Sequence, residues 1–217
     1  MSRHRAPEEL LLDYAAGGLA EGPALAVAVH VALDAGARRM VGRLGMLAGA
    51  LLDGEREAIV DDEALRQTLA RLDGVTVEAR TERAQAAAGP AWAPEPLRRY
   101  LGTASKWRHR RMGGFDEMPL RLHGDSHRAS LLRLEPGRGL PRHRHIGDEY
   151  TVVLQGGFTD TTGSYATGDF CVGPDEIHEP IADAGEPCIA LIALANPIVL
   201  TGPIGRYLNP LVRRGWL

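Results

Sequence analysis

The chain has 217 residues, a length that suits one or two domains of ordinary size. Its formal net charge of −3 argues against the clustered basic surface of a nucleic-acid-binding protein, so we expect no direct contact with nucleic acid. Two cysteines, Cys171 and Cys188, are too few for a disulfide framework. No stretch reaches the ~20 uncharged apolar residues of a membrane span, and no signal peptide is recognisable at the N-terminus, so we expect a cytoplasmic protein without membrane contact.

The first 75 residues have the periodicity of helices. A first helix is predicted to begin at Pro7 and to end at Gly17 and Gly18, because proline suits the first position of a helix and glycine its end. Three more helices are predicted over about 23–35, over about 38–52 and onward from a cap at Asp61 or Asp62. The second of them is apolar nearly all round, which is typical of a helix that is buried centrally or covered by a partner.

The second half of the chain has the shorter period of strands. Residues 76–96 are rich in alanine, proline and charge, and we interpret them as a linker. Strands are predicted over 119–123, 129–135, 149–155, 168–173 and 187–194, separated by turn residues. Many short strands of this kind indicate a sandwich or barrel, and residues 196–217 are expected to pack back on the barrel or on the helices. The sequence therefore predicts a multidomain α+β protein, with a helical domain over 1–75, a linker over 76–96 and a β-barrel over 97–217.

One segment of the barrel has the spacing of a metal-binding motif. From Gly137 to Gly156 the sequence reads G-x5-H-x-H-x3-E-x6-G, which resembles the first cupin motif at every position. Gly168, Pro174 and His178 resemble the second motif. His178 lies four residues after Pro174 instead of five, and Glu176 stands where a glycine is common, so the second motif is the looser of the two.

The spacing of these residues agrees with metal ligation. Alternate side chains of a strand share a face, so His143 and His145 can point together into a barrel, while Glu149 can return from the next strand and His178 from a separate one. Three imidazoles and a carboxylate suit a divalent transition metal, and we expect zinc. The alternative is a surface pair of histidines in a basic stretch, since arginines flank both.

The whole chain resembles the ChrR family of anti-sigma factors. The resemblance lies in the start HRAPEELLLDYAAGGLAEGPALAVAVHVAL, in VVLQGGF after the metal motif, and in the tail NPIVLTGPIGRYLNPLVRR. It implies that the N-terminal helices bind an extracytoplasmic-function (group IV) sigma factor and keep it off RNA polymerase. It also implies that a metal-binding cupin half acts as the sensor of an oxidant of the singlet-oxygen type, or of a small ligand.

The resemblance implies a second zinc site in the helical half, at an early histidine and an H-x3-C-x2-C motif. His4 and His30 match the two histidines, but Asp34 and Ala37 stand where the family has cysteines. A weak site built from His4, His30 and Asp34 is one possibility. The alternative, which we favour, is that apolar packing alone holds the helices.

Two functions from different classes fit these features. One is the regulator that the family resemblance implies, and the other is a metal-dependent cupin dioxygenase or isomerase that acts on a small molecule, because such a site can hold open coordination positions. The apolar second helix favours the regulator, since four short helices cannot readily cover it. We therefore expect no enzymatic activity, and we expect a charge at Val27 or Val31 to weaken binding of the partner.

Overall fold

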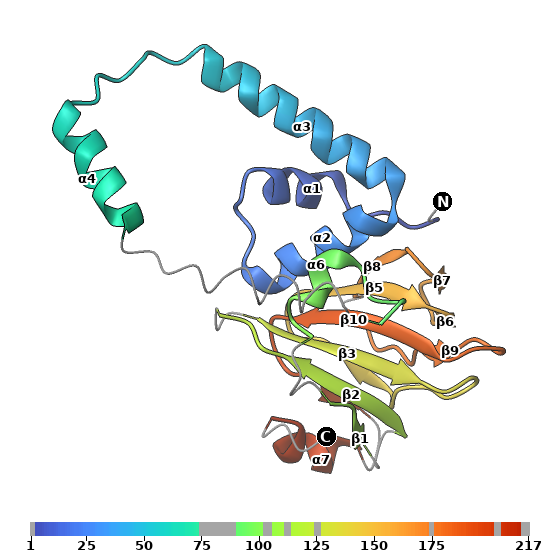
Figure 1. Ribbon diagram of the computed structural model, residues 1–217. Coiled ribbons are helices and arrows are strands. Elements are labelled where there is room, and N and C mark those ends of the chain that lie inside the picture. The colour runs from blue at the N-terminus through green and yellow to red at the C-terminus, as the bar shows by residue number, and fades with distance from the viewer. Residues whose placement is uncertain are drawn as a thin grey trace.

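The structure is a computed structural model in which an N-terminal group of helices is followed by a β-rich half (Figure 1). It describes residues 3–73, 90–101, 106–110, 114–123, 127–173, 176–201 and 205–213. The predicted fold class, a helical region followed by a cupin-type β domain, is confirmed. Within these residues, no helix has both the length and the apolarity needed to cross a bilayer.

The four predicted N-terminal helices are present, with shifted ends. The helices that the structure describes are α1 (Glu8–Ala15), α2 (Glu21–Leu33), α3 (Ala35–Asp53), α4 (Asp62–Asp73), α6 (Glu95–Arg98) and α7 (Gly205–Arg213). Helix α3 begins at Ala35 because the Asp34 side chain accepts a hydrogen bond from the backbone N–H of Ala37 at 2.7 Å. Asp61 caps α4 in the same way through the N–H of Ala64. The carboxylate at position 34 therefore has a structural task at the start of α3.

The β-rich half consists of one large antiparallel sheet faced by two smaller ones. The strands are β1 (Arg108–Arg110), β2 (Phe115–Leu120), β3 (Arg128–Leu134), β4 (His143–Arg144), β5 (Glu149–Gln155), β6 (Gly157–Thr159), β7 (Ser164–Ala166), β8 (Phe170–Val172), β9 (Ile181–Ala182), β10 (Cys188–Leu194) and β11 (Val199–Leu200). The large sheet has the order β1-β2-β3-β10-β5-β8, and the smaller ones are β7-β6-β9 and β11-β4. Four of the five predicted strands correspond to β3, β5, β8 and β10, whereas the one predicted over 119–123 overlaps β2 only at its last two residues. The other strands, with two or three residues each, were missed because they are too short to show a period.

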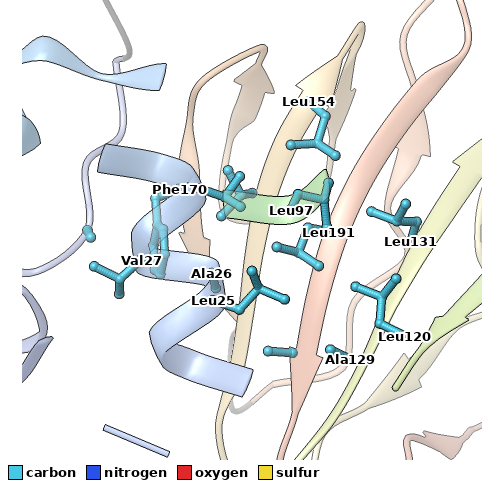
Figure 2. Packing of buried hydrophobic residues seen from close by; sticks show 14 of the residues in the cluster. Leu25, Ala26, Val27, Leu97, Leu120, Ala129, Leu131, Leu154, Phe170 and Leu191 are labelled. Carbon is cyan, nitrogen blue, oxygen red and sulfur yellow. The ribbon is translucent and has the colours of Figure 1, made fainter. Parts of the chain in front are cut away.

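Helix α2 packs on the outer face of the large sheet. Leu25 is buried there and belongs to one apolar cluster with Leu131 of β3 and Leu191 of β10, whereas Val27 is fully buried on the side of α2 that points away from the sheet (Figure 2). Strand alternation explains the arrangement, since the odd-numbered residues of β3 and β10 face the helix while the even-numbered ones face the barrel interior. The interpretation that the apolarity of α2 marks a partner surface is therefore wrong, because the chain's own sheet and its own neighbouring helices α1, α3 and α6 cover this helix.

A charge at Val27 is expected to destabilise the fold, not to report on a partner. Val27 is fully buried, so Val27→Asp would bury an unpaired carboxylate and lose the packing of the valine. We expect Val27→Asp to lower the free energy of unfolding by about 3 kcal/mol or more, measured by urea denaturation of the full chain. A variant as stable as the wild type would show that this side of α2 is not buried in solution.

The end of the predicted linker and the tail both contact the folded parts. Ala93 and Leu97 are buried in the same apolar cluster as α2, so the described end of the predicted linker, residues 90–96, packs where α2 meets the sheet. In the tail, β11 pairs with β4 and α7 packs beside β11, as expected for a tail that returns to the barrel. The domain boundaries themselves, 1–75, 76–96 and 97–217, stay a prediction.

Helix α4 and the second half of α3 extend away from this body (Figure 1). All residues from Gly45 to Leu72 are exposed. Their exposed side chains include large apolar residues, such as Leu51 and Leu69, whose exposed fractions are 66% and 53%. These two helical segments therefore present apolar surface that nothing in the described chain covers.

Candidate metal centre

The four predicted ligands come from three places in the barrel. His143 lies on β4, His145 follows it directly, and Glu149 opens β5 after a turn in which Gly147 has a φ of +85°. His178 is joined to the backbone of His143 by two hydrogen bonds, in which each residue's N–H donates to the other's carbonyl at 3.0–3.1 Å. This bridge brings the distant histidine to the strand that carries the first one.

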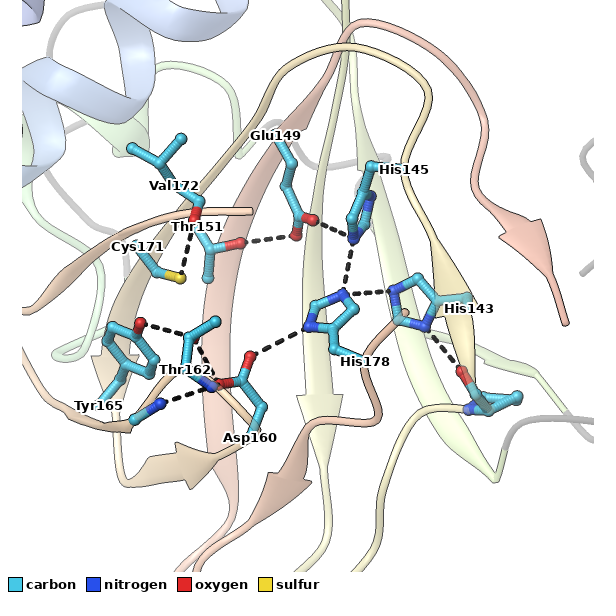
Figure 3. A network of polar contacts seen from close by, with 12 residues as sticks. His143, His145, Glu149, Thr151, Asp160, Thr162, Tyr165, Cys171, Val172 and His178 are labelled. Carbon is cyan, nitrogen blue, oxygen red and sulfur yellow. Dashed lines mark hydrogen bonds and ion pairs between the residues drawn. The ribbon is translucent and has the colours of Figure 1, made fainter. Parts of the chain in front are cut away.

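The side chains of these residues converge (Figure 3). The Nε2 atom of His178 lies 2.7 Å from that of His145 and 3.1 Å from that of His143. The Oε2 atom of Glu149 lies 2.5 Å from Nε2 of His145. His143, Glu149 and His178 are buried, and the side chain of His145 is only 4% exposed. Ligand atoms of the three histidines all lie within 4.8 Å of one another, and no comparable group of three or more occurs elsewhere in the residues that the structure describes.

Hydrogen bonds on the far side of two rings orient them toward the centre. Nδ1 of His143 donates to the carbonyl of Pro141 at 2.7 Å, and Nδ1 of His178 donates to Oδ2 of Asp160 at 3.0 Å. In neutral rings bonded in this way, both Nε2 atoms carry lone pairs and face each other. Lone pairs in that arrangement repel unless a cation lies between them, and such orienting bonds are typical of metal-binding histidines.

Asp160 was not found from the sequence. It belongs to neither cupin motif and follows the short strand β6, so no spacing signal marks it. Burial would raise the pKa of its carboxyl, but hydrogen bonds from Thr162 and His178 outweigh this effect and lower the pKa. Asp160 is therefore ionised at neutral pH and can hold the Nδ1 proton of His178.

Two of the ligands, His143 and Glu149, have the protonation states that a metal requires. Burial lowers the pKa of His143 to about 4, so its ring is neutral at pH 7. Burial would raise the pKa of Glu149, but the neighbouring histidines and Thr151 outweigh that effect and lower it. Its Oε2 is buried and accepts no hydrogen bond in the structure. A buried carboxylate oxygen without a donor, beside three imidazole nitrogens, fits a divalent transition metal.

The two cysteines do not contribute to this centre as thiolates. Cys171 and Cys188 are buried in the apolar cluster of the barrel that includes Phe158 and Tyr165. Burial raises the pKa of both thiols to about 12, which keeps them protonated. They act as small apolar residues of the core.

The second candidate group, His4, His30 and Asp34, is arranged differently. Nδ1 of His30 donates to the carbonyl of Gly168 at 3.0 Å, and its Nε2 accepts from the N–H of Ala6 at 3.2 Å. Asp34 caps α3 and pairs with Arg5 at 3.3 Å. The ring of His4 packs on Tyr165, with 4.6 Å between centroids. The structure therefore brings His30 and Asp34 into polar contacts within the chain and places His4 against the barrel.

These contacts join the first residues of the chain to the barrel. Oδ1 of Asp169 accepts from the N–H groups of Arg3 and His4, and the carbonyl of His4 accepts from the N–H of Phe170. The turn between β7 and β8, which carries Gly168 and Asp169, thus bonds both to the N-terminus and to α2. These polar contacts lie beside the apolar packing of α2 on the sheet, and together they hold the helices on the barrel.

The buried ring of His30 is expected to make the joint sensitive to acid. Burial lowers the pKa of His30, although its bond to Gly168 opposes this effect. The unfolded chain therefore binds a proton before the folded chain does, and the contribution of neutral His30 to stability falls as the pH drops below about 6.5.

We expect His30→Gln to reduce the loss of stability on acidification. Urea unfolding of wild type and variant at pH 7.5 and pH 5.5 measures it, and because the metal centre is intact in both proteins its own acid sensitivity cancels in the comparison. Equal losses in the two proteins would contradict the assignment of His30.

Comparisons with known proteins agree with this architecture. Residues 101–196 match the family model described as the ChrR cupin-like domain. The anti-sigma-E factor ChrR of Cereibacter sphaeroides is 32% identical over 213 residues, which are 97% of this chain and 98% of that protein.

A solved structure extends the similarity to three dimensions. The crystal structure of Rhodobacter sphaeroides SigE in complex with the anti-sigma ChrR superimposes with a TM-score of 0.74 at 32% identity, covering 88% of this chain and 98% of that one. The similarity includes the helices and the cupin half, and it extends over nearly all of both proteins. The chain therefore belongs to the ChrR family of anti-sigma factors.

Proposed function

We propose that this chain is an anti-sigma factor that binds an extracytoplasmic-function (group IV) sigma factor through α3 and α4. The observation that carries the proposal is the apolar surface that these helices expose. The exposed large apolar side chains on them are Met46, Leu47, Leu51, Leu52, Leu65, Leu69 and Leu72. Contiguous apolar surface of this extent marks an interaction site.

The spacing of these residues gives each helix one binding face. Leu47 and Leu51 are four residues apart on α3, and Leu65, Leu69 and Leu72 recur at helical spacing on α4. The connection between the two helices, residues 54–61, is exposed throughout, so α4 can close over a partner seated on α3. Membership of the ChrR family, in which a relative is solved in complex with SigE, supports a sigma factor as the partner.

We propose that the cupin half holds one zinc ion through His143, His145, Glu149 and His178. When bound, zinc would supply a fixed positive charge that keeps the four side chains together. The cupin half would then report an oxidant of the singlet-oxygen type or a small ligand to the helices, through the joint at α2 and at residues 168–170. Because a sigma factor acts on RNA polymerase in the cytoplasm, we propose the same location for this chain.

We propose further that the helical half is held without a second metal. Both ring nitrogens of His30 have partners in the chain, and Asp34 caps α3. The packing of α2 on the sheet supplies apolar burial that four isolated helices would lack. A site made of His4, His30 and Asp34 would require these contacts to be exchanged for metal bonds.

The test of the proposed function is inhibition of transcription. The full chain, purified with its metal, is added to RNA polymerase and a group IV sigma factor of the same organism, and transcription from a promoter of that sigma factor is measured. We expect a stoichiometric complex and loss of transcription. The absence of a complex, together with turnover of a small molecule by the metal-loaded chain, would favour the enzyme alternative.

A further inference from the structure

The barrel contains a cavity of about 600 Å³ that opens beside the metal centre. His143, His145 and Glu149 form part of its wall, so a molecule in the cavity would lie next to the metal. The size lies within the range of pockets that hold small organic ligands, about 300–1,000 Å³. The tail closes one side of it, through Leu200 of β11 and Val212 of α7.

Most of the wall is apolar. The apolar residues that line it include Phe115, Leu132, Leu140, Ile192, Leu194, Leu200 and Val212. An apolar cavity of this size next to polar ligands favours a molecule with a hydrocarbon body and one polar end. The apolar part of the wall does not select the charge of that end.

Arginines on the wall determine which charge the polar end of the ligand carries. Arg108, Arg110, Arg128 and Arg142 line the cavity, against the two carboxylates of Glu117 and Glu149. Both carboxylates are already engaged, since Arg110 pairs with Glu117 at 2.5–2.7 Å and Glu149 lies among the metal ligands. Among the residues that the structure describes, no carboxylate pairs with the other three arginines.

Strand alternation shows that Arg128 is an inward residue. On β3, Arg128, Ser130 and Leu132 line the cavity, whereas Leu131 faces α2 and Arg133 is absent from the cavity wall. Arg108 and Arg128 are both exposed, so their guanidinium groups lie in water at the open side of the cavity while their positions on the wall keep them beside its apolar part. A ligand carboxylate would accept charge-assisted hydrogen bonds from them there.

We infer that this cavity is a binding site for a small organic carboxylate with an apolar tail, whose carboxylate is held by Arg108 and Arg128 and whose tail lies along the sheet toward Ile192. This inference goes beyond the proposed function, because it assigns a ligand class to the cupin half whether or not the helices bind a sigma factor. The ligand is placed against the strands that lie under α2, since β3 and β10 have one face in the cavity and the other on the helix.

The experiment is calorimetric titration of the full zinc-loaded chain with octanoate, 1-octanol and octylammonium, which share a tail and differ in charge. We expect one octanoate per chain, about tenfold weaker binding of octanol and still weaker binding of octylammonium. The double variant R108M/R128M should weaken octanoate about tenfold and leave octanol unchanged. R133M is the matched control, because Arg133 lies on the same strand outside the cavity, and it should change neither.

Two further arms separate the arginines from the metal and test the cavity itself. Leu132→Trp fills the cavity and should abolish binding of octanoate and octanol alike, whereas removal of zinc by a chelator should leave octanoate bound within a few-fold. Octanoate that binds no tighter than octanol would overturn the inference. So would octanoate binding that is lost with the zinc and retained in R108M/R128M, because the carboxylate would then be a metal ligand.

Discussion

Charges on the exposed faces of α3 and α4 are expected to abolish binding of the sigma factor. Leu51 and Leu69 are more than half exposed in the free chain, and burying two leucines against a partner contributes about 3–6 kcal/mol. The double variant L51D/L69D loses this contribution and must also desolvate two carboxylates in the complex. We therefore expect its affinity for the sigma factor to fall at least about 100-fold, measured by surface plasmon resonance with the full chain.

The matched control for this variant is Gln67→Asp. Gln67 lies on the opposite side of α4 from Leu69 and Leu65, so the substitution adds a negative charge to the same helix away from the apolar face. Its affinity should stay within a few-fold of the wild type. Since all these positions are exposed, circular dichroism should show folded protein in every case. Equal losses of affinity in the control and test variants would refute a specific apolar binding face.

Loss of the imidazoles at His143 and His145 is expected to remove the metal and to destabilise the barrel. The wild type should contain one zinc per chain, and H143A/H145A should contain none, because only one imidazole and one carboxylate remain. Without the ion, the buried carboxylate of Glu149 loses its counter-charge. We expect the free energy of unfolding to fall by several kcal/mol, with the metal measured by inductively coupled plasma mass spectrometry and stability by urea denaturation.

The metal content of these two proteins also tests the helical site. Two zinc ions in the wild type, with one kept in H143A/H145A, would show that His4, His30 and Asp34 bind metal. Full retention of a single zinc in the double variant would overturn the cupin assignment. His109→Ala is a suitable control, because His109 is exposed and pairs only with Asp116 at 2.8 Å among the described residues, so its loss should leave the metal content unchanged.

The contacts between the helices and the barrel offer a route by which a signal in the cupin half would reach the helices. The β3 and β10 strands have one face on the cavity and one face on α2, and residues 168–170 bond to both the N-terminus and His30. A change in the barrel wall on that side would therefore shift residues that contact α2 and the N-terminus. Helix α2 connects that base to α3 by a single residue, Asp34, which caps α3.

The sequence by itself determined the features that depend on neighbours along the chain. His143, His145 and Glu149 are separated by a strand end and a turn, so their spacing alone predicts that they share a site. Helices α1 to α4 follow in the same way from local periodicity and caps such as Asp61. The family resemblance added the sigma factor as a partner, a feature that no periodicity could supply.

Only the tertiary structure decided which surfaces are covered and which polar atoms meet. An apolar helix is equally compatible with a partner and with the chain's own core, and the burial of Leu25 toward the sheet and of Val27 on the opposite side of α2 decides for the core. Asp160 meets His178, and His30 meets Gly168, across 18 and 138 residues of sequence. Contacts over such separations arise from strand pairing and layer packing, which local patterns do not encode. The arginine-lined cavity could not be predicted from the sequence for the same reason, because its wall combines residues from several strands and from the tail.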